Sequence, residues 1–100
     1  MSAKLIAPTT SAVTDVKSIT LQSLNVTITT EGFAGGAGTI DLWYRAQKEG
    51  PWQELWQKGA RVQLSNTHRL ETVYGHLFVG VSKTSTDESV GVYSSSSANK

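Results

Sequence analysis

Apolar and polar residues alternate along several short segments of this chain. The clearest case is the segment 24–29, in which Leu, Val and Ile alternate with Asn and Thr. Because successive side chains of a β-strand point to opposite faces, this segment is predicted to be a strand whose aliphatic face lies on a core. The segment 39–46 repeats the pattern, with one face formed by Ile40, Leu42 and Tyr44.

Six further segments have the composition or spacing of short strands, and turn residues separate them. These segments are 17–21, 52–56, 61–64, 69–73, 76–83 and 90–93. Gly and Pro mark turns at 48–51 and 58–59, and no stretch has helical spacing. The pattern predicts an all-β fold, namely a small antiparallel β-sandwich or barrel, immunoglobulin-like or jelly-roll-like, of about seven short strands.

The chain is predicted to form one domain with two polar ends. Its 100 residues suffice for one hydrophobic core but not for two. We expect residues 1–15 to form an extended N-terminal arm, 16–93 a single β-sandwich domain, and 94–100 a polar C-terminal tail. The segment 32–38 contains four glycines. Strand interiors rarely accommodate such a density of glycine, so this segment is expected to be a flexible connection.

Composition and charge argue against several classes of function. Nine Lys and Arg residues against eight acidic residues give a formal net charge of +1, which is too small to hold nucleic acid or an anionic membrane. The absence of Cys argues against a disulfide scaffold or a thiolate metal site. Since no extended apolar run follows Met1, we expect neither a signal peptide nor a membrane span, and synthesis in the cytoplasm.

Candidate catalytic residues are scarce. The two histidines are His68, in a predicted turn, and His76, on the polar face of a predicted strand. Both are interpreted as surface residues, and the acidic residues are not spaced as a catalytic carboxylate pair. The sequence therefore predicts that the protein is not an enzyme, with no catalytic residue, no cofactor and no metal site.

Three tryptophans lie on two segments that are predicted to form one hairpin. Trp43 is on the first segment, Trp52 and Trp56 are on the second, and Arg45 and Arg61 are close in sequence. Because side chains alternate along a strand, Trp52 and Trp56 should share one face, and Leu55 is predicted to point to the opposite, core side. In one interpretation the indoles close an edge of a small core. In the other they form an exposed platform for a protein partner or for sugar rings, because aromatic and Arg side chains dominate binding interfaces.

Several short segments occur in an order that is familiar from one group of proteins. They are 3–10 at the start, the linker 32–35, the hairpin 40–42 with 52–55, the segment 59–64 and the ending 90–93. In this order they resemble small β-rich proteins encoded among the structural genes of tailed phages. The resemblance spans most of the chain and implies a virion accessory protein, such as a capsid decoration (cement) protein or a head-fibre part. It implies many copies per particle and a symmetric oligomer, and it supplies no catalytic residues.

The leading hypothesis is therefore a non-enzymatic phage virion structural protein, made in the host cytoplasm, that decorates or cements the capsid surface. Its contacts would be the N-terminal arm and the strand edges, and its partners the major capsid protein or another virion protein, together with copies of itself. The alternative is a carbohydrate-binding or host-surface-binding module that uses an exposed tryptophan platform. The candidate contact residues are Leu5, Ile6, Pro8, Trp43, Arg45, Trp52, Trp56 and Arg61.

Overall fold

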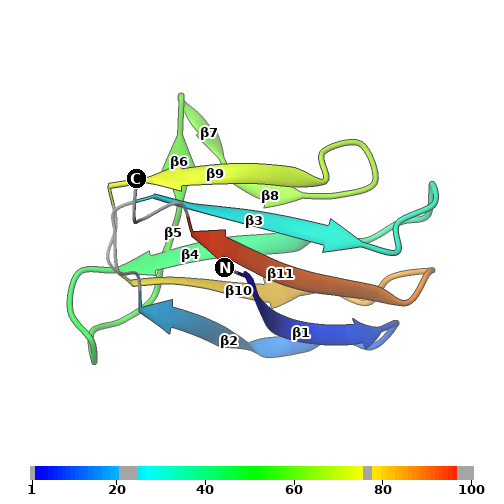
Figure 1. Ribbon diagram of the computed structural model, residues 1–100, viewed down its shortest axis with the longest axis horizontal. Coiled ribbons are helices and arrows are strands. Elements are labelled where there is room, and N and C mark those ends of the chain that lie inside the picture. The colour runs from blue at the N-terminus through cyan, green and yellow to red at the C-terminus, as the bar shows by residue number, and fades with distance from the viewer. Residues whose placement is uncertain (1, 21–24, 76–77, 97–100) are drawn as a thin grey trace.

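The computed structural model describes residues 2–20, 25–75 and 78–96, and every helix or strand in these ranges is a β-strand (Figure 1). The strands are β1 (Ser2–Thr9), β2 (Val13–Thr20), β3 (Asn25–Glu31), β4 (Ile40–Arg45), β5 (Gln53–Glu54), β6 (Trp56–Gln57), β7 (Ala60–Arg61), β8 (Gln63–Leu64), β9 (Leu70–Tyr74), β10 (Phe78–Lys83) and β11 (Val90–Ser96). The prediction of an all-β fold is confirmed.

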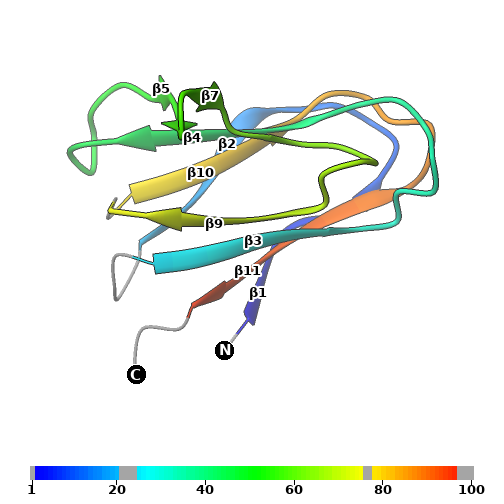
Figure 2. The same ribbon diagram turned by 90° about the horizontal axis from the view of Figure 1, so that it is seen from above.

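Two antiparallel sheets pack face to face, and Figure 2 shows them as two layers. The four-stranded sheet has the order β1-β11-β3-β9. The five-stranded sheet has the order β2-β10-β4-β5, and β8 also pairs with β4. The short strands β6 and β7 form a separate hairpin. The described residues thus form a β-sandwich, as predicted.

The strand pairing is nested from the ends of the chain inward. The first strand pairs with the last, β2 pairs with β10, β3 with β9, and β4 with β5, and every pair is antiparallel. Successive long strands also alternate between the two sheets. A long hairpin of four strand pairs that folds over on itself produces this order, which is the arrangement of a jelly roll. Of the two sandwich types predicted, the strand order is therefore that of the jelly roll.

The core lies between the sheets and follows the alternation of the sequence. In β3 the side chains of Val26 and Ile28 are buried, and in β4 those of Ile40 and Leu42 are buried. Leu24, which was also predicted to face the core, lies outside the described residues. The other buried core side chains are those of Ile6, Phe33, Leu55, Val62, Leu64, Val73, Val79, Val81, Val90 and Val92.

Both predicted polar ends were placed wrongly. Instead of an extended arm, residues 2–9 form β1, which pairs with β11, and the segment from Val13 onward is β2 of the other sheet. Ile6 is only 5% exposed, so its burial contributes to the sandwich and fixes the strand in place. At the other end, residues 94–96 belong to β11 rather than to a tail, and Ser94 is buried. Residues 97–100 of the predicted tail lie outside the described residues.

The segment 32–38, which was expected to be flexible, is tied to two distant loops. The Gly36 amide donates to Oε1 of Glu88 at 3.2 Å, and the Gly36 carbonyl accepts from Nδ2 of Asn66 at 2.7 Å. Glycine is needed at the start of the segment, where Gly32 has a φ of 114° and a Cβ would collide with the Ser89 carbonyl. These contacts hold the connection between β3 and β4 against the end of the sandwich.

The two predicted strands 52–56 and 61–64 are broken into four pieces. Leu55 lies between β5 and β6 and is fully buried, in agreement with the prediction that it points to the core. The turn predicted at 58–59 connects β6 and β7. Lys58 and Gly59 have φ values of 56° and 79°, which a tight two-residue hairpin turn of this kind requires.

Candidate functional site

The predicted tryptophan and arginine residues gather on the outer side of the five-stranded sheet. We call Trp43, Arg45, Trp52, Trp56 and Arg61 the tryptophan face. Trp43 and Arg45 alternate with the buried residues of β4 and so point away from the core. The structure therefore brings together all five residues that the sequence analysis selected from this region.

Trp43 packs on the sheet and under an arginine. Its Nε1 donates a hydrogen bond to Oγ of Ser82 at 2.9 Å, and Ser82 on β10 is only 8% exposed. The guanidinium carbon of Arg61 lies 4.8 Å from the centroid of the Trp43 ring. Arg61 is held there by its bond from Nη1 to the Leu42 carbonyl, at 2.6 Å. Trp43 is thus a half-buried residue with a defined orientation.

Trp52 lies over a glycine of the same sheet. Gly80 on β10 is the register partner of Trp43, and a Cβ on it would lie 3.0 Å from Cη2 of Trp52. The guanidinium carbon of Arg45 lies 4.2 Å from the centroid of the Trp52 ring, a cation–π geometry. Both side chains are partly buried. Trp52 therefore covers the outer surface of the sheet and does not enter the core.

Trp56 differs from the other two indoles because it is 56% exposed. Its Nε1 donates to Oε1 of Glu54 at 3.4 Å, and the same carboxylate oxygen lies 3.7 Å from Nε of Arg61. Neither interpretation describes all three tryptophans. Trp43 and Trp52 are packed on the sheet, outside the central core, and Trp56 is presented to solvent.

The three candidate residues of the former arm have different surroundings. Ile6 is buried in the core and cannot contact a partner while the domain is folded, so its selection as a contact residue was wrong. Leu5 is partly buried and packs against the core. Pro8 is exposed, and its ring lies close to Gly91 of β11. Only Pro8 of the three is presented to solvent.

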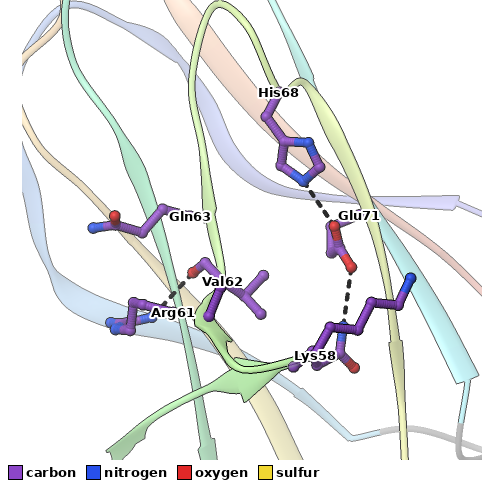
Figure 3. Close-up of a pocket in the computed structure, with 8 residues that line it drawn as sticks. Lys58, Arg61, Val62, Gln63, His68 and Glu71 are labelled. Carbon is purple, nitrogen blue, oxygen red and sulfur yellow. Dashed lines mark hydrogen bonds and ion pairs between the residues drawn. The ribbon is translucent and has the colours of Figure 1, made fainter.

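A cavity of about 400 Å³ that the sequence did not predict lies between the β6–β8 segment and β9 (Figure 3). His68 and Glu71 line one side, and their Nε2 and Oε1 atoms are 2.7 Å apart. Gln57 and Val62 line the side formed by the β6–β8 segment. Both carboxylate oxygens of Glu71 are thus engaged, since Oε2 accepts a hydrogen bond from Nε2 of Gln57. His76, the other histidine considered, lies outside the described residues.

The side chain of Gln57 bridges the cavity to the edge of the four-stranded sheet. Its Nε2 donates to Oε2 of Glu71 at 3.0 Å and to the Thr72 carbonyl at 3.1 Å, and its Oε1 accepts from the Tyr74 amide at 3.1 Å. If a parallel strand lay beside β9, one of its residues would donate its N–H to the Thr72 carbonyl and accept a hydrogen bond from the Tyr74 amide. The Gln57 carboxamide thus takes the place of a strand at this edge.

A buried lysine joins the loops at the other end of the sandwich. Lys83 is 2% exposed, and its Nζ donates to the Ser11 carbonyl at 3.1 Å, the Thr84 carbonyl at 3.2 Å and Oγ1 of Thr86 at 2.8 Å. Burial lowers the pKa of the Lys83 ammonium from its usual 10.5. Nothing in the sequence pattern distinguished this lysine from a surface residue.

In the described part of the chain, no three His, Asp or Glu side chains lie close enough together to hold a metal ion. The described ranges also contain no helix long and apolar enough to cross a bilayer. Comparison of the chain with protein-family models, with curated proteins and with solved structures gives no match.

Proposed function

We propose that the protein is a non-enzymatic structural component of a phage virion that decorates or cements the capsid surface. The observation that carries the proposal is the position of β1. In the described residues β1 is one of the two outer strands of the four-stranded sheet and pairs only with β11. Its other side offers backbone groups to a strand of a neighbouring protein, which is a common way for rigid β-domains to assemble.

The composition of the exposed surface of β1 supports binding to a protein partner. Ala3, Ala7 and Pro8 are exposed, and Lys4 is the only charged residue of this strand. The net charge of +1 offers no field for nucleic acid. The partner proposed is the major capsid protein or another virion protein. Since a protein that binds only the assembled shell favours that shell by mass action, such binding would stabilise the particle.

The test is co-sedimentation of the purified protein with capsids that lack it. Saturable binding with a stoichiometry that matches the capsid symmetry is expected. Deletion of residues 2–10 is unsuitable because it removes a core strand, so the exposed position Ala7 is used instead. Ala7→Arg should weaken binding by about tenfold or more, because it places a charged, bulky side chain in a packed contact. Ala46→Arg, at an exposed position after β4, is the matched control and should bind normally.

A second candidate function, carbohydrate or host-surface binding, is favoured by one observation. Trp56 is exposed, and Glu54 and Arg61 lie beside it. An aromatic ring flanked by hydrogen-bonding groups suits a sugar ring, which presents both apolar and hydroxyl surfaces. Retention on a glycan array that is lost in Trp56→Ala, together with failure to bind capsids, would favour this function over the first.

A further inference from the structure

The strand β9 has one free edge whose geometry is symmetric about its middle residue. In the described residues β9 is an outer strand and pairs with β3 alone. The Thr72 carbonyl and the Tyr74 amide both point away from β3, toward Gln57. Because backbone groups alternate in direction along a strand, those of Leu70 point to the same free side. Leu70, Thr72 and Tyr74 therefore present their amides and carbonyls outward.

The two large exposed side chains of β9 are also placed symmetrically about Thr72. Leu70 is 54% exposed and Tyr74 is 58% exposed, and each lies two residues from Thr72 on the outer face of the sheet. These two and Trp56 are the large hydrophobic side chains that the described residues leave most exposed. Two of the three thus occupy equivalent places on one edge strand.

We infer that the free edge of β9 is a self-association site, at which two copies of the chain pair antiparallel about a two-fold axis at Thr72. In this pairing Thr72 faces Thr72, and Leu70 of each copy faces Tyr74 of the other. Cross-strand pairs of an aromatic and an aliphatic residue stabilise antiparallel sheets. The interface is isologous, since the same patch serves both copies. Glu71 would face Val73 of the second copy, so no like charges oppose each other.

Gln57 competes with the second copy for the same backbone groups. The carboxamide of Gln57 makes the hydrogen bonds to β9: Nε2 donates to Glu71 and Thr72, and Oε1 accepts from the Tyr74 amide. The cavity of about 400 Å³ separates the rest of the β6–β8 segment from this strand. Release of the carboxamide therefore frees the Thr72 carbonyl and the Tyr74 amide for pairing. Gln57 acts as a cover that keeps the free protein largely monomeric.

The size of the contact implies weak association. Five residues of one strand bury far less than the roughly 800 Å² per partner of a standard interface. We therefore expect a dissociation constant of about 0.1–1 mM for the wild-type dimer. Such a contact gains strength when many copies are held close together, because neighbours then bind at a high effective concentration. The inference does not depend on what holds them, and so it does not require the proposed capsid role.

The first experiment is sedimentation equilibrium of the wild type and Gln57→Ala over a wide concentration range. Because each of the two copies loses two competing hydrogen bonds, the dimer dissociation constant should fall by about thirtyfold or more. Gln53→Ala, at an exposed glutamine on β5, is the matched control and should leave the constant unchanged. Adding Leu70→Lys to Gln57→Ala should restore the monomer, because lysine on an edge strand opposes pairing.

The second experiment identifies the contacting residues. The chain contains no Cys, so a single introduced thiol reports on one position. The Cα atoms of a hydrogen-bonded antiparallel pair lie about 5.5 Å apart, within the span of a disulfide. Thr72→Cys should therefore form a disulfide dimer under mild oxidation, and faster in the Gln57→Ala background. Thr14→Cys, at an exposed position on β2, should not.

Circular dichroism of each variant shows whether it is folded, so that loss of structure is not mistaken for a change in association. A folded Gln57→Ala that remains monomeric at about 1 mM would overturn the inference. It would also be overturned if Thr72→Cys were to oxidise no faster than Thr14→Cys. Either result leaves the capsid-binding proposal intact, because that proposal depends on β1 at the opposite edge of the sheet.

Discussion

The indole of Trp52 occupies the space that a side chain at position 80 would fill. A Cβ added to Gly80 would lie 3.0 Å from the ring and 3.1 Å from the Lys17 carbonyl, and it would collide with Val16. The glycine therefore allows β2, β10 and the indole to meet on the outer face of the five-stranded sheet. This arrangement makes Trp52 part of the scaffold rather than a free binding surface.

Gly80→Ala is expected to lower the free energy of unfolding by about 1–3 kcal/mol, because the added methyl group overpacks this contact. Urea denaturation measures the change. Gly50→Ala is the matched control, since a Cβ at Gly50 meets nothing closer than 3.5 Å. Equal stability of Gly80→Ala and the wild type would show that neither Val16 nor Trp52 packs against this glycine.

Trp52 and Trp56 are expected to respond differently to truncation. Trp56→Ala should change the free energy of unfolding by no more than about 0.5 kcal/mol, because the residue is mostly exposed. Trp52→Ala removes a ring packed on Gly80 and under Arg45, and should cost about 1–3 kcal/mol. Thermal or urea unfolding of both variants shows which of the two loses more stability. A larger loss for Trp56→Ala would contradict the assignment of Trp56 as the presented indole.

Leu55 is expected to anchor the short strands that carry the tryptophan face. Its side chain is fully buried, and its backbone bonds link β4 to the β6–β8 segment. Leu55→Ala should lower the free energy of unfolding by about 2–5 kcal/mol through lost burial and the cavity that remains. Gln53→Ala, two residues away and exposed, should have little effect. Equal free energies of unfolding for Leu55→Ala and Gln53→Ala would show that the Leu55 side chain does not lie in the core.

Lys83 is expected to make stability depend on pH in the alkaline range. Because burial lowers its pKa in the folded state, the unfolded chain binds the proton more tightly. The free energy of unfolding therefore increases as the pH rises from the pKa of Lys83 in the folded state toward 10.5, its value in the unfolded chain. Lys83→Met does not titrate, so the difference in unfolding free energy between wild type and variant should shift in favour of the wild type as pH increases. A difference that is constant with pH would contradict this expectation.

Alternation in the sequence was sufficient to predict β3, β4 and the inward direction of Leu55, because each of these segments has one face on the core. It failed for β1. The register of β1 against β11 shifts between Lys4 and Ile6 and again between Ile6 and Thr9. Such irregularities interrupt the alternation of inward and outward side chains. The sequence of β1 therefore lacks the alternating pattern of a strand and was interpreted as a polar arm.

The candidate site was predicted in part for a similar reason. The tryptophan face comes from neighbouring segments of one hairpin region, and their proximity follows from the turns between them. The bonds from Gln57 to β9 and the burial of Lys83 depend on segments that meet only when the two sheets pack. The alternation of apolar and polar residues within one segment does not indicate contacts between segments that are distant in the sequence.

The nested pairing has a consequence for how the chain reaches its native state. Of the described strands, β1 is synthesised before all the others, and it pairs with β11, which is synthesised after them. The four-stranded sheet therefore cannot be completed until β11 has left the ribosome, and its folding must close the long loop between β1 and β11. We expect refolding on the millisecond-to-second timescale typical of β-sandwiches dominated by distant pairings. During that interval β3 and β9 can associate before β1 and β11 have joined the sheet.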